Sequence, residues 1–417
     1  MSWREMTLGE ITDLKRGFDL PKSQRLQGDV PVYSSSGITG SNSTAAVEGP
    51  CVITGRYGTI GEVFFSGGPC WPLNTALYST EFNGNNPRFV YYLLQTIPWQ
   101  GYTTASAVPG VNRNHVNLCP VKIPDKATQD AIVEVLDSIV DKIALNNQLN
   151  DYLEQLCQSL FNRFDNDENN PFVKVSDIAD VNPRRTLKKG EEALCIEMAD
   201  LSTTGAFPTD WRTKAYNGGV KFVNGDTILA RITPCLENGK AGYINFLEQD
   251  EVAFGSTEYI VLTSKGELPS EFFYFLARNE DFISYATAHM NGSSGRQRVS
   301  GSDVGNYEVR MPSEKQISEF RKIAGNAMRV ISASSIESRK LAQLRDALLP
   351  KLMSGEIDAS KVELTQLTNN HLSGCGSFCS VCCPSGLASE FHEWFREHFF
   401  FGYGHLCKAD LGWEDLP

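Results

Sequence analysis

The sequence contains an internal repeat, and each copy ends in a proline that precedes a long helical pattern. The first copy spans residues 3–124 and the second spans residues 172–312. The matching segments are 87–94 with 269–277, Gly110-x-x-Arg113 with Gly295-x-x-Arg298, and 121–124 with 309–312. Their offset grows from 169 residues at Trp3 and Phe172 to 188 at Pro124 and Pro312, as small loop insertions in the second copy would cause. The repeat predicts two similar modules, which suit a partner that is bound at two places.

Each module is expected to be rich in short strands. In the first copy, short apolar runs such as 30–33, 51–54, 62–65 and 75–78 alternate with glycine and proline, which is typical of strands joined by tight loops. A single helix from residue 87 to about 96, with proline in its first turn, interrupts them. The predicted fold class is therefore α+β, and a chain of 417 residues needs at least two cores.

After each module the hydrophobic period changes to that of a long helix. The apolar positions are Ile132, Leu136, Ile139, Ile143, Leu149, Leu153, Leu156 and Leu160 in the first helix, and Ile317, Phe320, Ala324, Ala327, Ile331, Leu341, Leu348 and Leu352 in the second. We predict that the two helices pair as an antiparallel coiled coil, with Asn146 and Ser334 on its seam to fix the register. The alternative is two separate amphipathic helices, each packed on its own module.

These patterns divide the chain into six segments. They are a module at 1–124, a helix at 125–164, a polar linker at 165–171, a module at 172–312, a helix at 313–356 and a tail at 357–417.

The composition bears on location and on the class of partner. The N-terminus lacks the apolar core of a signal peptide and no stretch is long enough to span a bilayer, so we expect a cytoplasmic protein with no membrane partner. Six cysteines outside the tail stand singly in apolar surroundings and are expected to be reduced, buried thiols. The net charge of −12 argues against a nucleic-acid partner unless positive charge is clustered locally or a partner subunit supplies it.

The usual signatures of catalysis are missing from the body of the chain. There is no phosphate-binding loop, no Asn-Pro-Pro-aromatic methyltransferase motif, and only His115 and His289 lie outside the tail. The glycine-rich segment 55–61 is not followed by a long helix, so turn glycines explain it better than a dinucleotide site. We therefore predict a protein that is not an enzyme and binds no cofactor itself.

Basic and amide residues on loops are the remaining candidates, because Arg suits guanine edges, Asn and Gln suit adenine, and Lys suits phosphate. Arg56 and Arg231 each follow an apolar run, at matching places in the two copies. The candidate DNA-binding set is Arg56, Asn112, Arg113, Asn114, Arg184, Arg185, Arg231, Arg296, Gln297 and Arg298. For each residue the alternative is a solvated surface charge or an ion pair within its own module.

Several motifs resemble the specificity subunit of type I restriction-modification enzymes. They lie at residues 7–11, 224–231, 295–299, 311–317 and 347–355, and the likeness covers about residues 2–358. The resemblance implies two target-recognition domains on double-stranded DNA, each reading one half of a bipartite site. It further implies that the helices act as a ruler and as a docking surface for methyltransferase subunits, with restriction subunits as further partners. S-adenosylmethionine, ATP and Mg²⁺ would then belong to the partner subunits. The alternative function is a non-catalytic coiled-coil scaffold that binds two copies of a partner protein.

The tail departs from that family. Cys375, Cys379, Cys382 and His392 include a Cys-x2-Cys pair with zinc-ligand spacing, but a second such pair is missing, so they are weak metal candidates. The tail is a zinc-binding extension, an unrelated appended or frame-altered segment, or a partner-binding extension.

Overall fold

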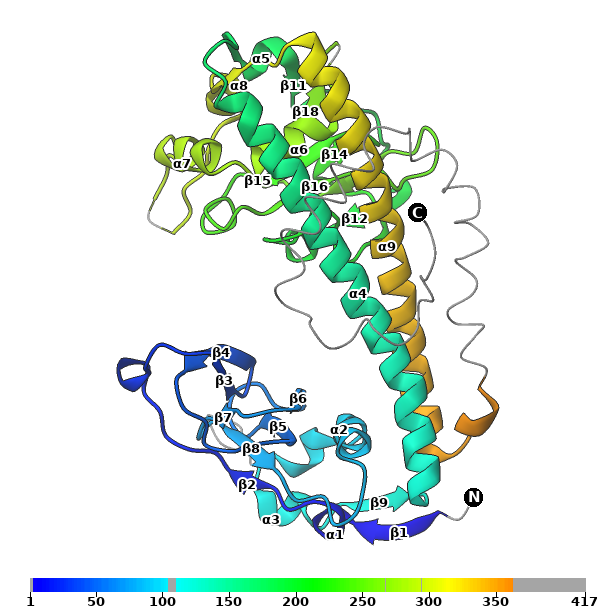
Figure 1. The fold of residues 1–417 in the computed structure, drawn as a ribbon. Helices are drawn as coiled ribbons and strands as arrows, with labels where there is room; N and C mark the ends of the chain where they lie inside the picture. Colours follow the sequence, from blue (N-terminus) through cyan, green and yellow to red (C-terminus); the bar gives the residue numbers. More distant parts are fainter. Residues whose placement is uncertain (1–2, 104–109, 267, 294, 363–417) are drawn as a thin grey trace, which may run out of the picture. The chain divides into compact units, whose positions relative to one another are not determined.

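The first module contains the strands and the helix that its sequence predicts. A computed structural model of the chain describes residues 3–103, 110–266, 268–293 and 295–362 (Figure 1). The elements of the module are β1 Arg4–Thr7, α1 Leu8–Ile11, β2 Lys15–Arg16, η1 Lys22–Gln24, β3 Val30–Ser34, β4 Gly37–Asn42, β5 Cys51–Gly55, β6 Val63–Ser66, β7 Trp71–Pro72, β8 Ala76–Ser79, α2 Pro87–Gln95, η2 Trp99–Tyr102, α3 Arg113–Val116 and β9 Pro120–Ile123. The strands form sheets of order β2-β8-β5-β6, β4-β3-β7 and β1-β9. The fold class α+β is confirmed.

The second module repeats this topology. Its elements are β10 Phe172–Lys174, α5 Val175–Ile178, β11 Ala179–Val181, β12 Glu192–Ile196, η3 Met198–Asp200, β13 Arg212–Ala215, β14 Val220–Phe222, β15 Thr227–Ala230, β16 Ala241–Tyr243, β17 Ala253–Gly255, β18 Tyr259–Ser264, α6 Glu271–Ala277, α7 Glu280–Ala288, α8 Gly301–Gly305 and β19 Glu308–Arg310. The sheet orders β11-β18-β15-β16 and β10-β19 match those of the first module strand for strand. The third sheet, β13-β12-β17-β14, has an extra strand, and α7 is a further addition of the second module.

Backbone hydrogen bonds establish which residues of the two modules are equivalent. The carbonyl of Arg56 accepts from the amide of Val111, and the carbonyl of Arg231 accepts from that of Val299, so the predicted equivalence of the two arginines is confirmed. The same bonds make Val111 equivalent to Val299. Arg113 therefore corresponds to Gly301 rather than to Arg298, and our match of Gly110-x-x-Arg113 with Gly295-x-x-Arg298 is wrong by three residues.

The start of the repeat also needs correction. Glu5 pairs with Lys122 across β1 and β9, while Phe172 pairs with Arg310 across β10 and β19. Because Lys122 and Arg310 are equivalent, Phe172 corresponds to Glu5, and the match with Trp3 is wrong. The offset there is 167 residues. Trp3 is half-buried and precedes β1, whereas Phe172 is an exposed residue of β10, so the two aromatic residues hold different places in the fold.

The two long helices are α4 (Lys126–Asp165) and α9 (Glu314–Ser354). Each begins directly after a capping side chain: Asp125 accepts from the amide of Thr128, and Ser313 from that of Gln316. The α9 helix ends at Gly355, whose φ of 78° is left-handed and therefore favours glycine. These bounds correspond to the segments predicted at 125–164 and 313–356; the finer division into modules and linker stays a prediction.

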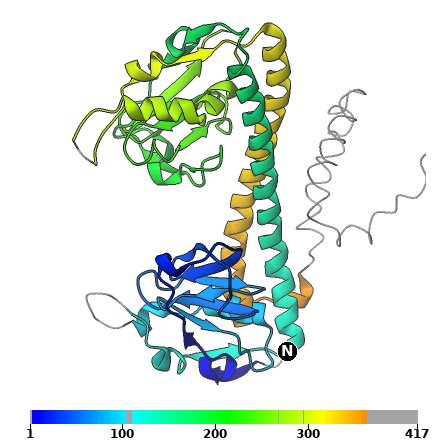
Figure 2. The same ribbon diagram turned by 60° about the vertical axis from the view of Figure 1, so that its left-hand side comes forward.

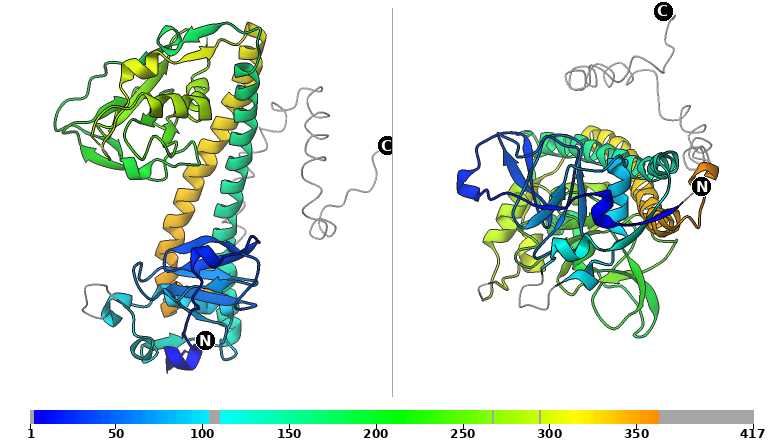
Figure 3. Two further views of the ribbon diagram at one scale, coloured as in Figure 1. Left: turned by 90° about the vertical axis from the view of Figure 1, so that its left-hand side faces the viewer. Right: turned by 90° about the horizontal axis from the view of Figure 1, so that it is seen from below.

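The helices α4 and α9 pack side by side along their length (Figures 2 and 3). The rings of Phe164 and Phe320 lie 5.5 Å apart near one end of the pair, and Asn146 donates to the carbonyl of Ser334 midway along it. Partners later in α4 are thus earlier in α9, so the antiparallel pairing and the seam positions of Asn146 and Ser334 are confirmed. Two helices without mutual contact are excluded.

The middle of this seam is polar, and one residue of the predicted stripe is misplaced. Asn146 also donates to Glu337 and Ser338, and Asn150 accepts from Ser334. Leu149 is 42% exposed instead of lying on the seam, because the two asparagines on either side of it take the buried positions.

Each module is attached to its own stretch of α4. In the first, Arg88 on α2 binds Asp137, and the Tyr92 hydroxyl donates to the same carboxylate. In the second, Tyr274 on α6 donates to Glu154 at 2.7 Å. The two attachments are 17 residues apart, about 26 Å along the helix.

Residues 1–357 form one compact unit, and the structure describes residues 358–362 of a second unit at 358–417, with the short helix η4 (Ala359–Lys361). The tail candidates Cys375, Cys379, Cys382 and His392 lie outside the described residues. The six other cysteines are free, and five of them are buried, as predicted. Within the described ranges, no helix combines the length and apolarity needed to cross a membrane.

Candidate nucleic-acid interface

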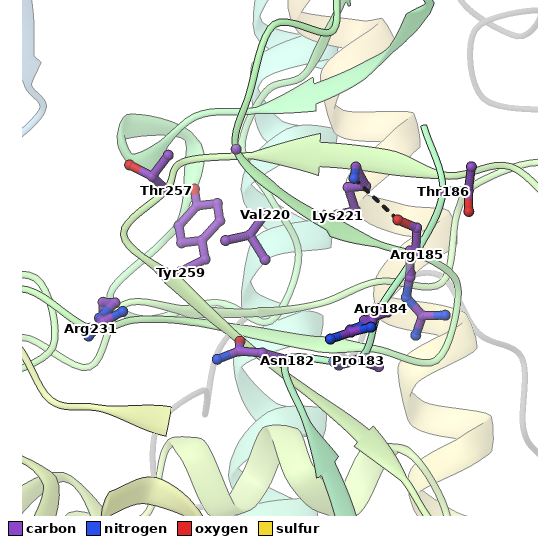
Figure 4. Close-up of a pocket in the computed structure, with 11 residues that line it drawn as sticks. Asn182, Pro183, Arg184, Arg185, Thr186, Val220, Lys221, Arg231, Thr257 and Tyr259 are labelled. Carbon is purple, nitrogen blue, oxygen red and sulfur yellow. Dashed lines mark hydrogen bonds between the residues drawn. The ribbon is translucent and has the colours of Figure 1, made fainter. Parts of the chain in front are cut away.

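Each module has a hollow lined by positive charge at the same place in its fold. The first hollow, of about 730 Å³, includes Lys15, Arg16, Arg56 and Arg113. The second hollow, of about 530 Å³, includes Arg184, Arg185, Lys221 and Arg231 (Figure 4). In the part of the chain that the structure describes, no carboxylate lines either hollow. Some of the cations do pair with carboxylates that lie outside the lining: Lys15 with Glu81, Arg16 with Asp19 and Arg185 with Asp226. Clustered cations with no carboxylate in the lining attract a polyanion such as DNA even though the chain as a whole is acidic.

The equivalent arginines reach the hollows because both follow a buried strand. Thr227–Ala230 of β15 are all buried, so the strand is fixed in the core and Arg231 is the first residue to leave it. Cys51–Gly55 of β5 are buried in the same way before Arg56. Each arginine is therefore positioned by the sheet and not by a flexible loop.

The side chain of Arg56 is only lightly held. Its guanidinium carbon lies 4.5 Å from the centre of the Tyr57 ring, a cation–π contact, and one nitrogen is 3.5 Å from the carbonyl of Asn74. Tyr57 is itself 39% exposed. A cation and an exposed aromatic ring together suit contact with DNA.

Arg231 has no ion pair among the described residues, although its charge lies close enough to Glu258 to help lower the pKa of that carboxyl. The Arg231 Nε is buried and has no hydrogen-bond partner within the described residues, and the side chain borders the second hollow beside Tyr259. A buried donor without a partner costs stability unless something binds it. Arg56 and Arg231 thus remain the strongest candidates.

Arg185 is committed to its own module. It donates to Asp226 at 2.7 Å and to Thr263, and the Asp226 side chain is fully buried. Burial raises the pKa of Asp226, while hydrogen bonds from Thr263, the amide of Val223 and Arg185 oppose that rise. The sequence left two interpretations of Arg185 open, contact with DNA or an ion pair within its own module. The structure shows the ion pair.

Arg298 has a carboxylate partner as well. Its guanidinium makes three hydrogen bonds of 2.7–3.0 Å with Glu258 and one with the carbonyl of Arg296. The bonds from Arg298 lower the pKa of Glu258. Arg298 therefore fastens a turn on which Arg296 is an exposed cation, with Gln297 half-buried beside it.

The remaining candidates lie at the rim. Asn112 caps α3 by accepting from the amide of Asn114, so the Asn112 amide has a structural role, whereas Asn114 is exposed. Arg113 is exposed at the start of α3, with one nitrogen 3.5 Å from the carbonyl of Leu14. Arg184 is exposed in the second hollow, where Lys221 on β14 was missed by sequence reasoning because the first module has no such strand.

The described part of the chain holds no group of three or more His, Cys, Asp and Glu side chains suited to a metal ion.

Comparisons with known proteins point to one family. The sequence model of the type I restriction modification DNA specificity domain matches residues 1–155. The type I restriction enzyme HindI specificity subunit of Haemophilus influenzae is 21% identical over 85% of this chain and 99% of its own length. The EcoEI specificity subunit of Escherichia coli is 26% identical over 46% of this chain and 33% of its own length. The crystal structure of a type I restriction-modification S subunit from M. genitalium shares the fold, with a TM-score of 0.58 at 16% identity over 84% of this chain and 96% of that one.

Proposed function

We propose that this chain, which belongs to the specificity subunits of type I restriction-modification enzymes, recognises the DNA sequence on which the whole complex acts. Each module reads one half of a bipartite site on double-stranded DNA, and the chain itself catalyses no reaction. The family match favours this function over a coiled-coil scaffold for two copies of a protein.

The observation that carries the proposal is the repeated basic hollow. Two equivalent folds place Arg56 and Arg231 at the same position, each among further cations. The modules are attached to α4 about 26 Å apart along the helix, from Asp137 to Glu154. That is about 8 base pairs at ~3.4 Å each, so two separate contacts on one duplex are expected.

The partner surface lies on the helix pair. Leu145, Leu149 and Tyr152 are 59%, 42% and 39% exposed and follow one another at helical spacing on α4. The seam at the same level is polar, with Asn146 and Asn150 buried. An apolar face on the outside of the helix pair can pack against a helix of another protein. We assign that partner helix to a methyltransferase subunit.

The chemistry is assigned to the partners. Methyltransferase subunits would bring S-adenosylmethionine, and restriction subunits would bring ATP and Mg²⁺, while this chain binds no cofactor. The net charge of −12 agrees with this assignment, because partner subunits would then supply much of the positive surface around the DNA.

The test is to map methylated bases in cells that express the chain with its methyltransferase subunit. A two-part motif with a fixed spacer is expected, and it should vanish when the chain is omitted. Methylation at the same positions without the chain would refute the proposal.

A further inference from the structure

The two modules share some hollow residues and differ in others, and this difference divides their roles. Arg56 and Arg231 are equivalent by their backbone bonds to Val111 and Val299. By the same pattern Arg298 is equivalent to Gly110, and Glu258, whose carbonyl accepts from Arg231, is equivalent to Thr75. A residue that both modules share offers the same contact to both half-sites. Any difference between the half-sites must therefore come from the residues that are not shared.

The shape of the surface also distinguishes the arginines that both modules share from the residues that differ between the modules. Arg56 and Arg231 lie in hollows, whereas base edges lie at the floor of a major groove about 8.5 Å deep. A side chain on a projecting turn reaches that floor more readily than one that lines a hollow. The phosphate backbone, which forms the ridges of the duplex, is the part of DNA that enters a hollow.

The turn from Asn291 to Arg298, which Arg298 fastens, projects from the module instead of lining a hollow. Asn291 and Arg298 form an antiparallel bridge at its base, and the amide of Arg296 donates to the carbonyl of Ser293 within it. Three hydrogen bonds from Arg298 to Glu258 tie this base to the strand region beside Arg231. Arg296 is exposed on a turn whose base is held by these hydrogen bonds, as a group that enters a groove needs to be.

We infer that Arg56 and Arg231 bind DNA phosphates in both half-sites, and that Arg296, on the turn fastened by Arg298 and Glu258, reads a base of the second half-site. The inference rests on the proposed function and refines it. Guanine is the base that an arginine fork recognises in the major groove, so Arg296 is assigned to a guanine. Arg298 is a positioning residue that acts through the turn.

The experiment uses the complex of the full chain with its methyltransferase subunit. DNA binding is titrated at several salt concentrations on cognate and non-cognate duplexes, and the methylated motif is mapped by sequencing. The variants are Arg56→Ala, Arg231→Ala, Arg56→Lys, Arg231→Lys and Arg296→Ala. Arg329→Ala, which removes an exposed arginine of α9 outside both hollows, is the matched control.

The alanine variants of the shared arginines should weaken cognate and non-cognate binding in parallel, about tenfold each. The slope of log affinity against log salt should fall by about 0.9 for each phosphate that is no longer bound, with the motif unchanged. The lysine variants should retain most of the affinity, because a phosphate accepts a point charge where a base edge needs the fork. Arg296→Ala should leave the salt slope close to that of the parent and relax the motif at one position of the second half-site.

Two results would overturn the inference. One is a changed motif in Arg231→Ala or in Arg231→Lys with the salt slope intact. The other is an unaltered second half-site in Arg296→Ala. Thermal unfolding of each variant shows whether a weaker affinity reflects misfolding, and the lysine variants keep the test valid where an alanine variant is unstable. If the parent complex shows no sequence preference, the proposed function itself fails; a preference that persists while Arg231→Ala alters the motif contradicts only the division of roles.

Discussion

At the scale of single residues, ion pairs within the second module decide which arginines are free to bind DNA. Arg185 and Arg298 are both occupied, one by the buried Asp226 and one by Glu258. Their partners lie 41 and 40 residues away in sequence, so no local pattern could have indicated them. Arg231 lines the same hollow as Arg185, and among the described residues it has no ion pair.

The pairing of Arg298 with Glu258 gives a prediction about the second half-site. If Arg298 acts through this bond, Arg298→Ala, Glu258→Ala and the double variant should lower affinity for that half-site by a similar factor. The coupling in unfolding free energy should be small, since both side chains are partly exposed. Binding titrations on duplexes altered in one half-site measure the affinities. A weaker affinity in Arg298→Ala with no change in Glu258→Ala would instead indicate direct contact of Arg298 with DNA.

Glu154 gives a prediction about pH. It is 9% exposed and accepts from the Tyr274 hydroxyl and the amide of Ala206, and burial raises its pKa. Because the pKa of Glu154 is higher in the folded state, the unfolded state loses this proton at a lower pH than the folded state does. The stability that the protonated Glu154 contributes is therefore fully present below the unfolded-state pKa of about 4.3, and it is lost as pH rises through the folded-state pKa. Glu154→Gln removes this loss. Relative to the parent, the variant should gain melting temperature as pH rises above the unfolded-state pKa; a difference that stays constant from below that pKa up to neutral pH would contradict the assignment.

At the scale of elements, most of the fold could be predicted because the repeat presents each pattern twice. The strands at Val30–Ser34 and Cys51–Gly55 and the helix Pro87–Gln95 lie where alternation and breakers place them. The helices α1 and α3 were missed because four residues are too few for a helical period. Leu149 differs from the predicted seam, because Asn146 and Asn150 and not the leucine make the interhelical hydrogen bonds.

The exposed face of α4 gives a prediction about assembly. Replacing Leu145 and Leu149 with Asp should abolish co-purification of the methyltransferase subunit, with an affinity loss of at least about tenfold. The melting temperature of the chain alone should hardly change, because both side chains are exposed. Asn147→Asp, which adds charge at an exposed position of the same helix turn outside the apolar face, is the matched control. Unaltered co-purification of the double variant would show that the subunit docks elsewhere.

At the scale of the whole molecule, the chain combines a net charge of −12 with two hollows that gather positive charge. Composition alone therefore argued against DNA, and only the folded arrangement shows where the cations meet. The repeat sets how many such hollows exist, and the helix pair sets their separation. The distance between two half-sites on a duplex also determines the angle between them around the duplex axis, because each added base pair turns the second half-site by about 35°.

This coupling predicts how the spacer responds to a longer helix pair. An insertion in α9 alone would shift one side of the polar seam against α4, so matched insertions are needed: four residues after Asn147 and four after Ser335. These keep Asn146 with Glu337 and Asn150 with Ser335. Four residues lengthen a helix by about 6 Å and turn it about 40° beyond a full turn. One added base pair matches that rotation but only about 3.4 Å of the length, whereas two match the length but overshoot the rotation.

Side chains at an interface can adjust to a length mismatch of a few ångströms more easily than a whole module can adjust to a rotation of about 35° around the duplex. The spacer of the methylated motif should therefore increase by one base pair, with both half-sites unchanged. Sequencing of methylated bases in cells carrying the lengthened chain measures this directly. A spacer that keeps its length would mean that the helix pair does not set the distance between the half-sites. An increase of two would mean that length, and not rotation, governs the spacing.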